Sequence, residues 1–339
     1  NTTASYNTAL GYQAVYGNTT GTENIGVGHN TLLANTTGNY NVAVGGFALD
    51  ANTTASNNTA VGYNSLGANT TGTQNTAVGA TTLDANTTGE NNTALGWSAL
   101  TASTTGSGNT AVGSVSLFVN TTGASNVAVG QEALRYNTTA SNNTAVGYQA
   151  LVANTTGANN VAIGKDALDS NTTGANNVAI GVDALQSNTT ADSNTAVGHS
   201  ALGANTTAGG NVAVGYLAMQ DSTTAANATA VGYEALANNT TSNGNHAFGF
   251  RALKACTTGS GNTAVGGSAG TAITTGTANT VVGASALTAN TTGANNVAVG
   301  DSSGAAVTTG SHNTCIGQDS GNGGVAITTG TGNSLLGTF

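Results

Sequence analysis

The sequence has no proline, few aromatic residues and very little charge: only 5% of its 339 residues are Asp, Glu, Lys or Arg. Four basic residues stand against 13 acidic ones, for a net charge of −9. A nucleic-acid surface needs clustered Lys and Arg, so the composition argues against that class of function. No apolar stretch is long enough to cross a membrane as a helix.

What the sequence does contain is a seventeen-residue repeat that runs through the whole chain. The repeat ends on a glycine preceded by a run such as Asn-Thr-Ala-Val-Gly, and only the last step is longer, by three residues. The closing glycines are Gly11, Gly28, Gly45, Gly62, Gly79, Gly96, Gly113, Gly130, Gly147, Gly164, Gly181, Gly198, Gly215, Gly232, Gly249, Gly266, Gly283, Gly300, Gly317 and Gly337. A fixed period of this length predicts a one-dimensional array and argues against a disordered linker. Because Asn1 already lies inside a repeat and no secretory signal precedes it, we expect a fragment or a processed product.

Each position of the repeat tolerates its own kind of residue, and we number these columns from the closing glycine as column 0. Column −1 is always large and apolar, and column +4 is almost always Leu, so both are predicted core positions. Column −3 is nearly always Thr or Val, which suits a strand, and column −2 is mostly Ala. Alternation along a strand puts columns −1 and −3 on one face and column −2 on the other. We expect the first face to pack inside the coil and the Ala face to meet a second layer or another chain.

The charged residues mark the outside of the array. All of them fall in columns +1, +2, +5, +6, +11 or +12, and the other columns carry none. A disordered chain would not keep such a partition.

Short strands separated by fixed turns predict an all-β fold, a parallel β-solenoid or flattened β-roll of about twenty coils stacked about 4.8 Å apart. We expect two strands in each coil, over columns −4 to −1 and +3 to +9. Residues 1–339 are predicted to form a single repeat domain, with regular coils over 1–265 and variant coils over 266–339. In the variant coils Gly270, Gly304 and Gly321 replace Leu, and an insert of three residues follows near Asn322, so the roll is expected to narrow there or to meet another module.

The repeat resembles a known kind of sequence. The run Asn-Thr-Ala-Val-Gly-Tyr-Gln-Ala-Leu at Asn143–Leu151 is similar to the head repeats of trimeric autotransporter adhesins and to repeats in phage tail-fibre proteins. The resemblance implies a left-handed parallel β-roll, assembled as a homotrimer, in an extracellular or virion fibre. The adhesin repeat is usually shorter than seventeen residues, and the chaperone domain common at the end of tail fibres is absent from this sequence.

Asn residues fill two columns, and they have two possible roles. Column −4 is Asn in all but one repeat, and column +7 begins an Asn-Thr-Thr glycosylation sequon in most repeats. Column +7 also holds Cys256, Ile273 and Val307, which indicates a buried position. We therefore favour stacked Asn ladders over glycans at column +7. The better glycan acceptors are sequons in the exposed column +12, namely Asn57, Asn91, Asn142 and Asn227, and O-linked sugars on Thr remain an open alternative.

Column +1 holds more aromatic residues than any other column. Its members include Tyr12, Tyr63, Trp97, Tyr148, Tyr216, Tyr233 and Phe250. Exposed aromatic side chains can bind sugars or pack against a partner, and we favour packing between chains, or simple tolerance of an aromatic residue at this column, over sugar binding. Cys256 and Cys315 lie in different columns four coils apart, about 19 Å at the spacing of stacked strands, so we expect buried free thiols.

No catalytic constellation is visible. The four histidines lie many repeats apart or in different columns. Asp166 and Asp169 beside Lys165 have no paired His or nucleophile, and the Gly-Gly-x-Gly-x-Asp motif of calcium-binding solenoids is missing. We expect no enzymatic activity, no cofactor and no metal.

The sequence therefore predicts a structural protein that forms the rigid shaft or head of an extracellular or virion fibre, with itself as partner in a homotrimer or filament. One alternative is an adhesin head that binds a host or surface glycan through columns +1, +2 and +5. Another is a self-assembling extracellular filament, with or without glycans. A third is an ice-binding solenoid built on the Thr-Thr columns +8 and +9, although adjacent residues of a strand face opposite ways and leave one outward Thr per coil.

Overall fold

The structure is a computed structural model that describes residues 3–322 and 327–337. It divides into two units, Asn1–Thr173 and Gly174–Phe339, and each is described by itself. Each unit is a parallel β-solenoid with a seventeen-residue repeat, and the described residues contain no helix. The predicted fold class is confirmed at this level. The predicted insert after Asn322 falls on residues 323–326, which lie outside the described residues.

Each coil contributes one strand of three residues, over columns −3 to −1. The strands of the first unit are β1 (Thr8–Leu10), β2 (Ile25–Val27), β3 (Val42–Val44), β4 (Thr59–Val61), β5 (Thr76–Val78), β6 (Thr93–Leu95), β7 (Thr110–Val112), β8 (Val127–Val129), β9 (Thr144–Val146) and β10 (Val161–Ile163). Those of the second unit are β11 (Val178–Ile180), β12 (Thr195–Val197), β13 (Val212–Val214), β14 (Thr229–Val231), β15 (His246–Phe248), β16 (Thr263–Val265), β17 (Thr280–Val282), β18 (Val297–Val299), β19 (Thr314–Ile316) and β20 (Ser334–Leu336).

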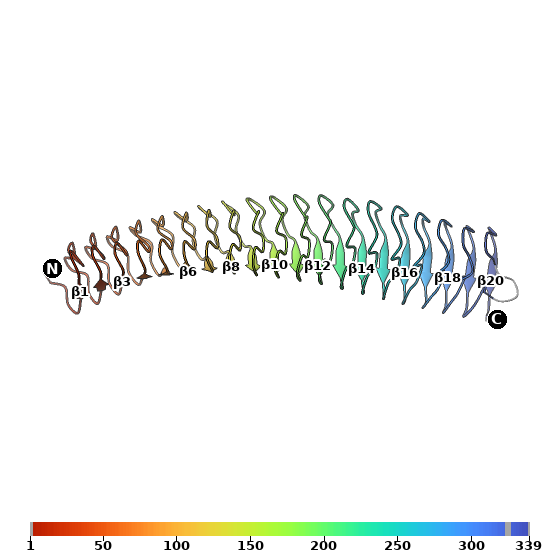
Figure 1. The fold of residues 1–339 in the computed structure, drawn as a ribbon, viewed down its shortest axis with the longest axis horizontal. Coiled ribbons are helices and arrows are strands. Elements are labelled where there is room, and N and C mark those ends of the chain that lie inside the picture. Colours follow the sequence, from red (N-terminus) through yellow and green to blue (C-terminus); the bar gives the residue numbers. More distant parts are fainter. Residues whose placement is uncertain (1–2, 323–326, 338–339) are drawn as a thin grey trace. The chain divides into compact units, whose positions relative to one another are not determined.

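Within each unit every strand pairs in parallel with the strands before and after it in the chain (Figure 1). The register joins residues of the same column: Thr144 faces Val161, and Ala145 faces Ala162. The seventeen-residue steps give this pairing throughout, and the longer last step keeps it as well, because Thr314 faces Ser334 twenty positions further along. Each column of the repeat therefore becomes a stacked row of side chains in the folded unit.

The wall opposite the strands is not a second strand, and that prediction was wrong. Residues in columns +2 and +4 have left-handed backbone, as in Asn64 and Leu66 with φ of 54° and 52°. Their amides still bond to neighbouring coils: the Asn64 N–H donates to the Gly46 carbonyl at 2.9 Å, and the Leu66 N–H donates to the Thr82 carbonyl at 3.0 Å. The column +2 amide thus bonds to the preceding coil and the column +4 amide to the following coil. This wall therefore satisfies these backbone groups without forming an extended strand.

The glycine of column 0 is required by the stacking of coils. Gly147 has a φ of +139°, which other residues rarely adopt. A Cβ built on Gly147 would lie 2.4 Å from the carbonyl oxygen of Gly164 in the next coil. Any side chain at this column would force two coils apart, and this explains why the repeat always closes on glycine.

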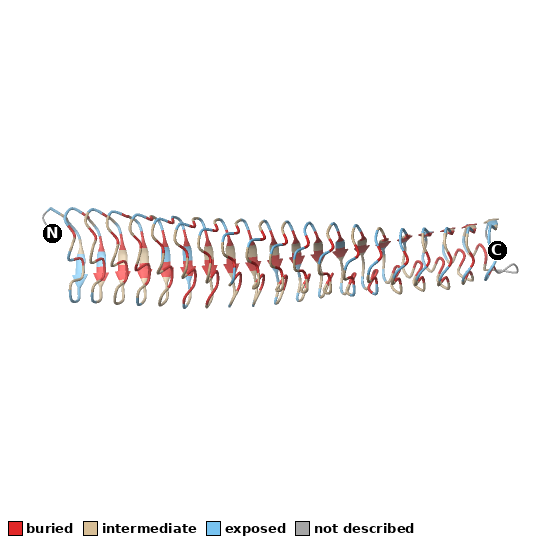
Figure 2. Cartoon of the chain, turned by 90° about the horizontal axis from the view of Figure 1, so that it is seen from above, coloured by how far each residue is buried: buried red, intermediate tan, exposed pale blue. Residues whose placement is uncertain are grey.

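The core lies on the other face of the strand from the one predicted. Ala145 of column −2 is fully buried, whereas Val146 of column −1 is only partly covered. Figure 2 shows that buried backbone stretches recur in the strands of successive coils. The coil is narrow, and column −2 faces columns +3 and +4 directly: a Cβ on Gly26 would lie 2.7 Å from Val15 Cγ2 and 2.9 Å from Thr31 Oγ1. Only a small residue fits opposite Leu, so column −2 is mostly Ala. The predicted core position +4 is confirmed, and the predicted core position −1 was wrong.

The variant coils exchange one large side chain for another instead of narrowing. Where Gly270 replaces the Leu of column +4, column +7 carries Ile273 in place of Asn. A Cβ on Gly270 would lie 2.9 Å from Ile273 Cδ1 and 3.0 Å from Leu253 Cδ2, so Ile273 fills the volume that Leu occupies elsewhere. Gly304 with Val307 and Gly321 with Ile327 repeat the exchange. The Asn row is interrupted as a result, and the buried amide of Asn290 between two such coils has no partner in the described chain.

This exchange predicts a coupled pair of substitutions. Gly270→Leu alone should lower the free energy of unfolding by about 1–3 kcal/mol, because the new side chain overpacks against Ile273 and Leu253. Adding Ile273→Asn should recover most of that loss, since the shorter side chain would vacate the space and its amide would give the Asn290 amide an acceptor. Denaturant unfolding of the two single variants and the double variant measures the coupling, and strictly additive losses would contradict the exchange.

Candidate interaction surfaces

Two rows of buried Asn side chains hold each coil to its neighbours. In column +7, Asn137 Nδ2 donates to Asn120 Oδ1 at 2.9 Å and to the Ala140 carbonyl at 3.0 Å. In column −4, Asn126 Nδ2 donates to the same Ala140 carbonyl at 2.9 Å, and the Asn126 N–H donates to Asn109 Oδ1 at 3.0 Å. The carbonyl of column +10 thus joins the two rows across the coil. The predicted Asn ladders are confirmed, and the buried amides of column +7 leave no room for a glycan in the folded coil.

The predicted glycan acceptors of column +12 lie on the surface. Asn57, Asn91, Asn142 and Asn227 are all exposed, and each has a left-handed backbone with φ between 57° and 63°. Asn tolerates this conformation better than most residues. The structure gives these side chains room for a glycan, and their modification stays a prediction.

The two Thr columns differ in what their hydroxyls do. Thr138 of column +8 donates its hydroxyl to the Thr155 carbonyl of the next coil at 3.0 Å, and this bond recurs along both units. Thr139 of column +9 is exposed. One Thr row is therefore committed to holding coils together, and one row faces solvent.

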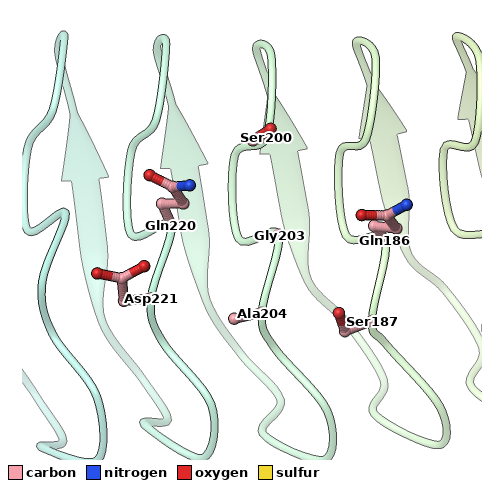
Figure 3. Close-up of a pocket in the computed structure, with 7 residues that line it drawn as sticks. All are labelled: Gln186, Ser187, Ser200, Gly203, Ala204, Gln220 and Asp221. Atoms are coloured by element: carbon pink, nitrogen blue, oxygen red, sulfur yellow. The ribbon is translucent and has the colours of Figure 1, made fainter.

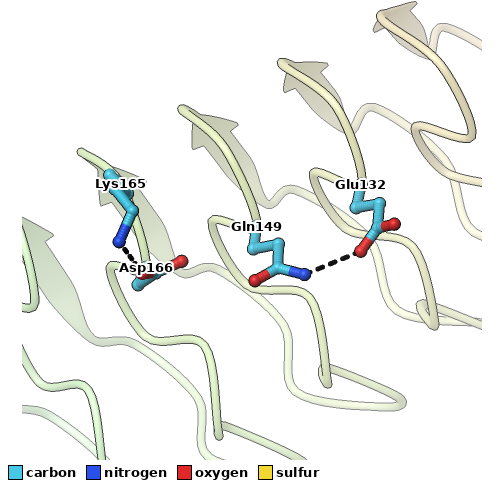
Figure 4. A network of polar contacts seen from close by, with 4 residues as sticks. All are labelled: Glu132, Gln149, Lys165 and Asp166. Carbon is cyan, nitrogen blue, oxygen red and sulfur yellow. Dashed lines mark hydrogen bonds and ion pairs between the residues drawn. The ribbon is translucent and has the colours of Figure 1, made fainter.

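The basic residues all lie beside carboxylates. Arg135 is 3.3 Å from Glu132, and Lys165 is 2.5 Å from Asp166 (Figure 4). Between these coils Gln149 Nε2 donates to Glu132 at 2.8 Å, which makes a polar row along column +2. In the second unit Arg251 and Lys254 lie 2.8 and 2.5 Å from one oxygen of Glu234.

Of these contacts, the hydrogen bond from Lys254 does most to hold the pKa of Glu234 below its usual value. Because every cation is neutralised locally, neither unit presents a free basic patch over its described residues.

The aromatic residues of column +1 are exposed, and some of them stack. His199, Tyr216, Tyr233 and Phe250 form a row in the second unit, with ring centroids 5.5, 5.2 and 5.4 Å apart. The Arg251 guanidinium lies 4.9 Å from the centroid of the Phe250 ring. In the first unit Tyr63 meets Phe47 edge-on at 5.9 Å, and Tyr12, Trp97 and Tyr148 are exposed. Consecutive coils thus bring together residues that the sequence separates by seventeen positions.

A polar notch of about 240 Å³ is lined by residues of three consecutive coils of the second unit (Figure 3). Gly203 and Ala204 form its floor, because these small residues occupy columns +5 and +6 between two coils with longer side chains. Its full lining is Gln186, Ser187, Ser200, Gly203, Ala204, Gln220 and Asp221. Ser200 Oγ lies 3.0 Å from His199 Nδ1 and so connects the notch to the aromatic row. Sequence reasoning missed this notch, whose only signal is a Gly-Ala pair flanked by polar residues in outward columns.

The outer face of the strands is apolar, and sequence reasoning missed it as well by placing column −1 in the core. Leu95 is 47% exposed, and Phe248 and Val265 are each 40% exposed. Column −3 lies beside it on the same face, with Thr or Val in most coils. Each unit therefore presents a row of large aliphatic side chains along the whole of its sheet.

The two cysteines are buried free thiols, as predicted. Burial raises the pKa of Cys256 to about 11 and raises that of Cys315 as well, so both stay protonated near neutral pH.

The described residues hold no group of three or more His, Cys, Asp or Glu side chains placed to bind a metal ion. Over the same residues, no helix has the length and apolar character needed to cross a membrane. No protein-family model matches the chain, and no curated protein sequence matches it.

The Asn rows predict that an Asn→Ser substitution lowers the free energy of unfolding much more in the buried column +7 than in the exposed column +12. Asn137→Ser should lower the free energy of unfolding by about 1–3 kcal/mol, because it leaves Asn120 Oδ1 without its donor and Asn154 Nδ2 without one acceptor. Asn142→Ser, on the exposed column +12, should change it by no more than about 0.5 kcal/mol. Denaturant unfolding of both variants tests this, and equal costs at the two positions would argue against the ladder.

Proposed function

We propose that the chain is a structural protein, the shaft or head of an extracellular or virion fibre. The observation that carries this proposal is that each coil bonds its backbone and its Asn side chains to the coils directly before and after it. Each repeat therefore adds the same increment of about 4.8 Å to its unit, and repeat number sets the distance that the unit spans.

Other features of the coils support a mechanical role. Stacked coils leave little unpaired backbone for a protease to bind, so the units should resist digestion. The outward columns +1, +2, +5 and +6 vary, whereas the buried columns keep their residue types, which favours a scaffold over a fixed site. We further propose, on the resemblance to adhesin heads, that the rolls are left-handed and assemble as parallel homotrimers.

Deleting whole repeats should shorten the molecule in proportion. Removing five repeats, residues 63–147, should reduce the length of the first unit by about 24 Å in electron micrographs, with protease resistance retained. Removing half a repeat, residues 140–147, should destroy that resistance, because it deletes β9 and leaves β8 and β10 without the strand that pairs with both. A chain whose length does not respond to repeat number would refute the spacer role.

Immunogold labelling with antibodies raised against the chain tests its place of action. Label on fibres outside cells or on virions is expected. Label confined to the cell interior would rule out the proposed location.

A second candidate function is glycan binding by an adhesin head, which the notch favours. Gln186, Gln220, Ser200 and Asp221 line one small hollow with amide, hydroxyl and carboxylate groups, and Ser200 contacts His199 of the aromatic row. Sugars are bound by such a combination of hydrogen-bonding groups and aromatic surface. The notch belongs to a single place in the second unit, so it would add specificity to a scaffold.

Filling the notch should abolish this binding. On a glycan array, Ala204→Gln should lower any signal of the full chain at least about tenfold, which corresponds to about 1.4 kcal/mol. The matched control is Ala153→Gln, which places the same side chain in column +6 of the first unit and should leave the signal unchanged. Absence of signal from the unmodified chain, or equal loss in both variants, would exclude the notch as a glycan site.

A further inference from the structure

The outer face of the sheet combines high exposure with an unvarying apolar column. Column −1 is Val in most coils and Ile, Leu or Phe in the rest, and it never carries a polar residue. Other outward columns behave differently: column +2 holds Glu132, Asp166 and Arg251 in different coils. An outward position that accepts only large apolar side chains has the composition of an interface.

We propose that this face, columns −3 and −1 of β1–β20, is the surface on which a second copy of the chain packs. The inference rests on the proposed fibre function and names the surface through which the fibre's chains associate. Within each unit, each strand of residues 3–322 and 327–337 contacts no strand other than those before and after it, and column −1 side chains such as Leu95 and Phe248 stay 47% and 40% exposed. Whatever covers the face must come from outside the unit.

A second copy of the chain fits this face better than any other occupant, because apolar side chains recur at the same spacing on both. The aliphatic side chains recur with every coil, about 4.8 Å apart, along each whole unit. A partner that matches all of them must present apolar groups at the same spacing, and another copy of this chain does so by construction. The three columns of the strands carry no Asp, Glu, Lys or Arg, so no charged partner is selected.

The size of the face is sufficient for a stable association. Three extended residues give a width of about 10 Å, and ten coils give a length of about 48 Å, or roughly 480 Å² of flat surface in each unit. The two units together offer roughly 960 Å² on each copy, compared with about 800 Å² per partner in a typical stable interface.

The experiment places lysine on this face and on a neighbouring outward column. The test variant is Val129→Lys with Val146→Lys, in column −1 of two adjacent coils. The matched control is Gln131→Lys with Gln149→Lys, in columns +1 and +2 of the same two coils. In a single chain, a lysine at any of these four positions can extend its charged end into solvent, because all four side chains reach the surface. Sedimentation equilibrium gives the mass, and circular dichroism checks that each variant keeps the wild-type fold.

The unmodified chain and the control should sediment as a multiple of 32.5 kDa, and the column −1 variant should shift toward 32.5 kDa. Its dissociation constant should rise at least about tenfold for each buried lysine. A milder variant, Val129→Thr with Val146→Thr, keeps the side-chain shape and should weaken association less. If the lysine variant does not fold, the dissociation constant of the threonine variant is compared with that of the control instead.

Two results would overturn the proposal: an unmodified chain that is monomeric at every concentration, or a folded column −1 variant that associates as tightly as the control. Either result leaves the repeat-deletion experiment unaffected, because the length of a unit does not depend on association. Failure of this inference is therefore distinguishable from failure of the spacer function.

Discussion

The structure depends on the pairing of each residue with its equivalent seventeen positions away. Backbone bonds between coils, the Asn rows and the Thr138-type hydroxyl bonds all join groups one repeat apart. Since each coil buries essentially one large aliphatic side chain, Leu or its substitute, hydrophobic burial per coil is small. Buried hydrogen bonds therefore contribute a large share of the cohesion between coils, and a single carbonyl such as that of Ala140 accepts from both Asn rows.

The narrowness of the coil explains most of the residue preferences. Column −2 holds Ala because Leu of column +4 faces it at contact distance, and column 0 holds Gly because the next coil leaves no space for a Cβ. Leu itself adopts a left-handed backbone in nearly every coil, at a cost of about 1 kcal/mol that only its complete burial offsets. The exchange of Leu and Asn for Gly270 and Ile273 shows that the coil requires a fixed volume and not a fixed residue.

Because the core uses only the inward columns, each outward column can carry its own kind of side chain. The strand face carries a continuous row of large apolar side chains in column −1, column +2 is polar in most coils, and column +1 stacks aromatic rings from His199 to Phe250. The same backbone thus offers a continuous surface suited to association and, in one place, the notch beside His199, a local hollow suited to a small polar ligand. A repetitive scaffold acquires specific features through single departures from the repeat, such as Gly203 with Ala204.

The sequence by itself determined the period, the parallel stacking of coils, the outward columns, the burial of Leu and the Asn ladders, because each follows from which residues recur at one column. It did not determine which side of the strand faces the core. Alternation separates Ala145 from Val146 but treats the two faces alike, and ordinary hydrophobicity assigns the larger residue to the interior. Only the tertiary structure decided otherwise, since left-handed residues at columns +2 and +4 bring the opposite wall so close that Ala alone fits between them.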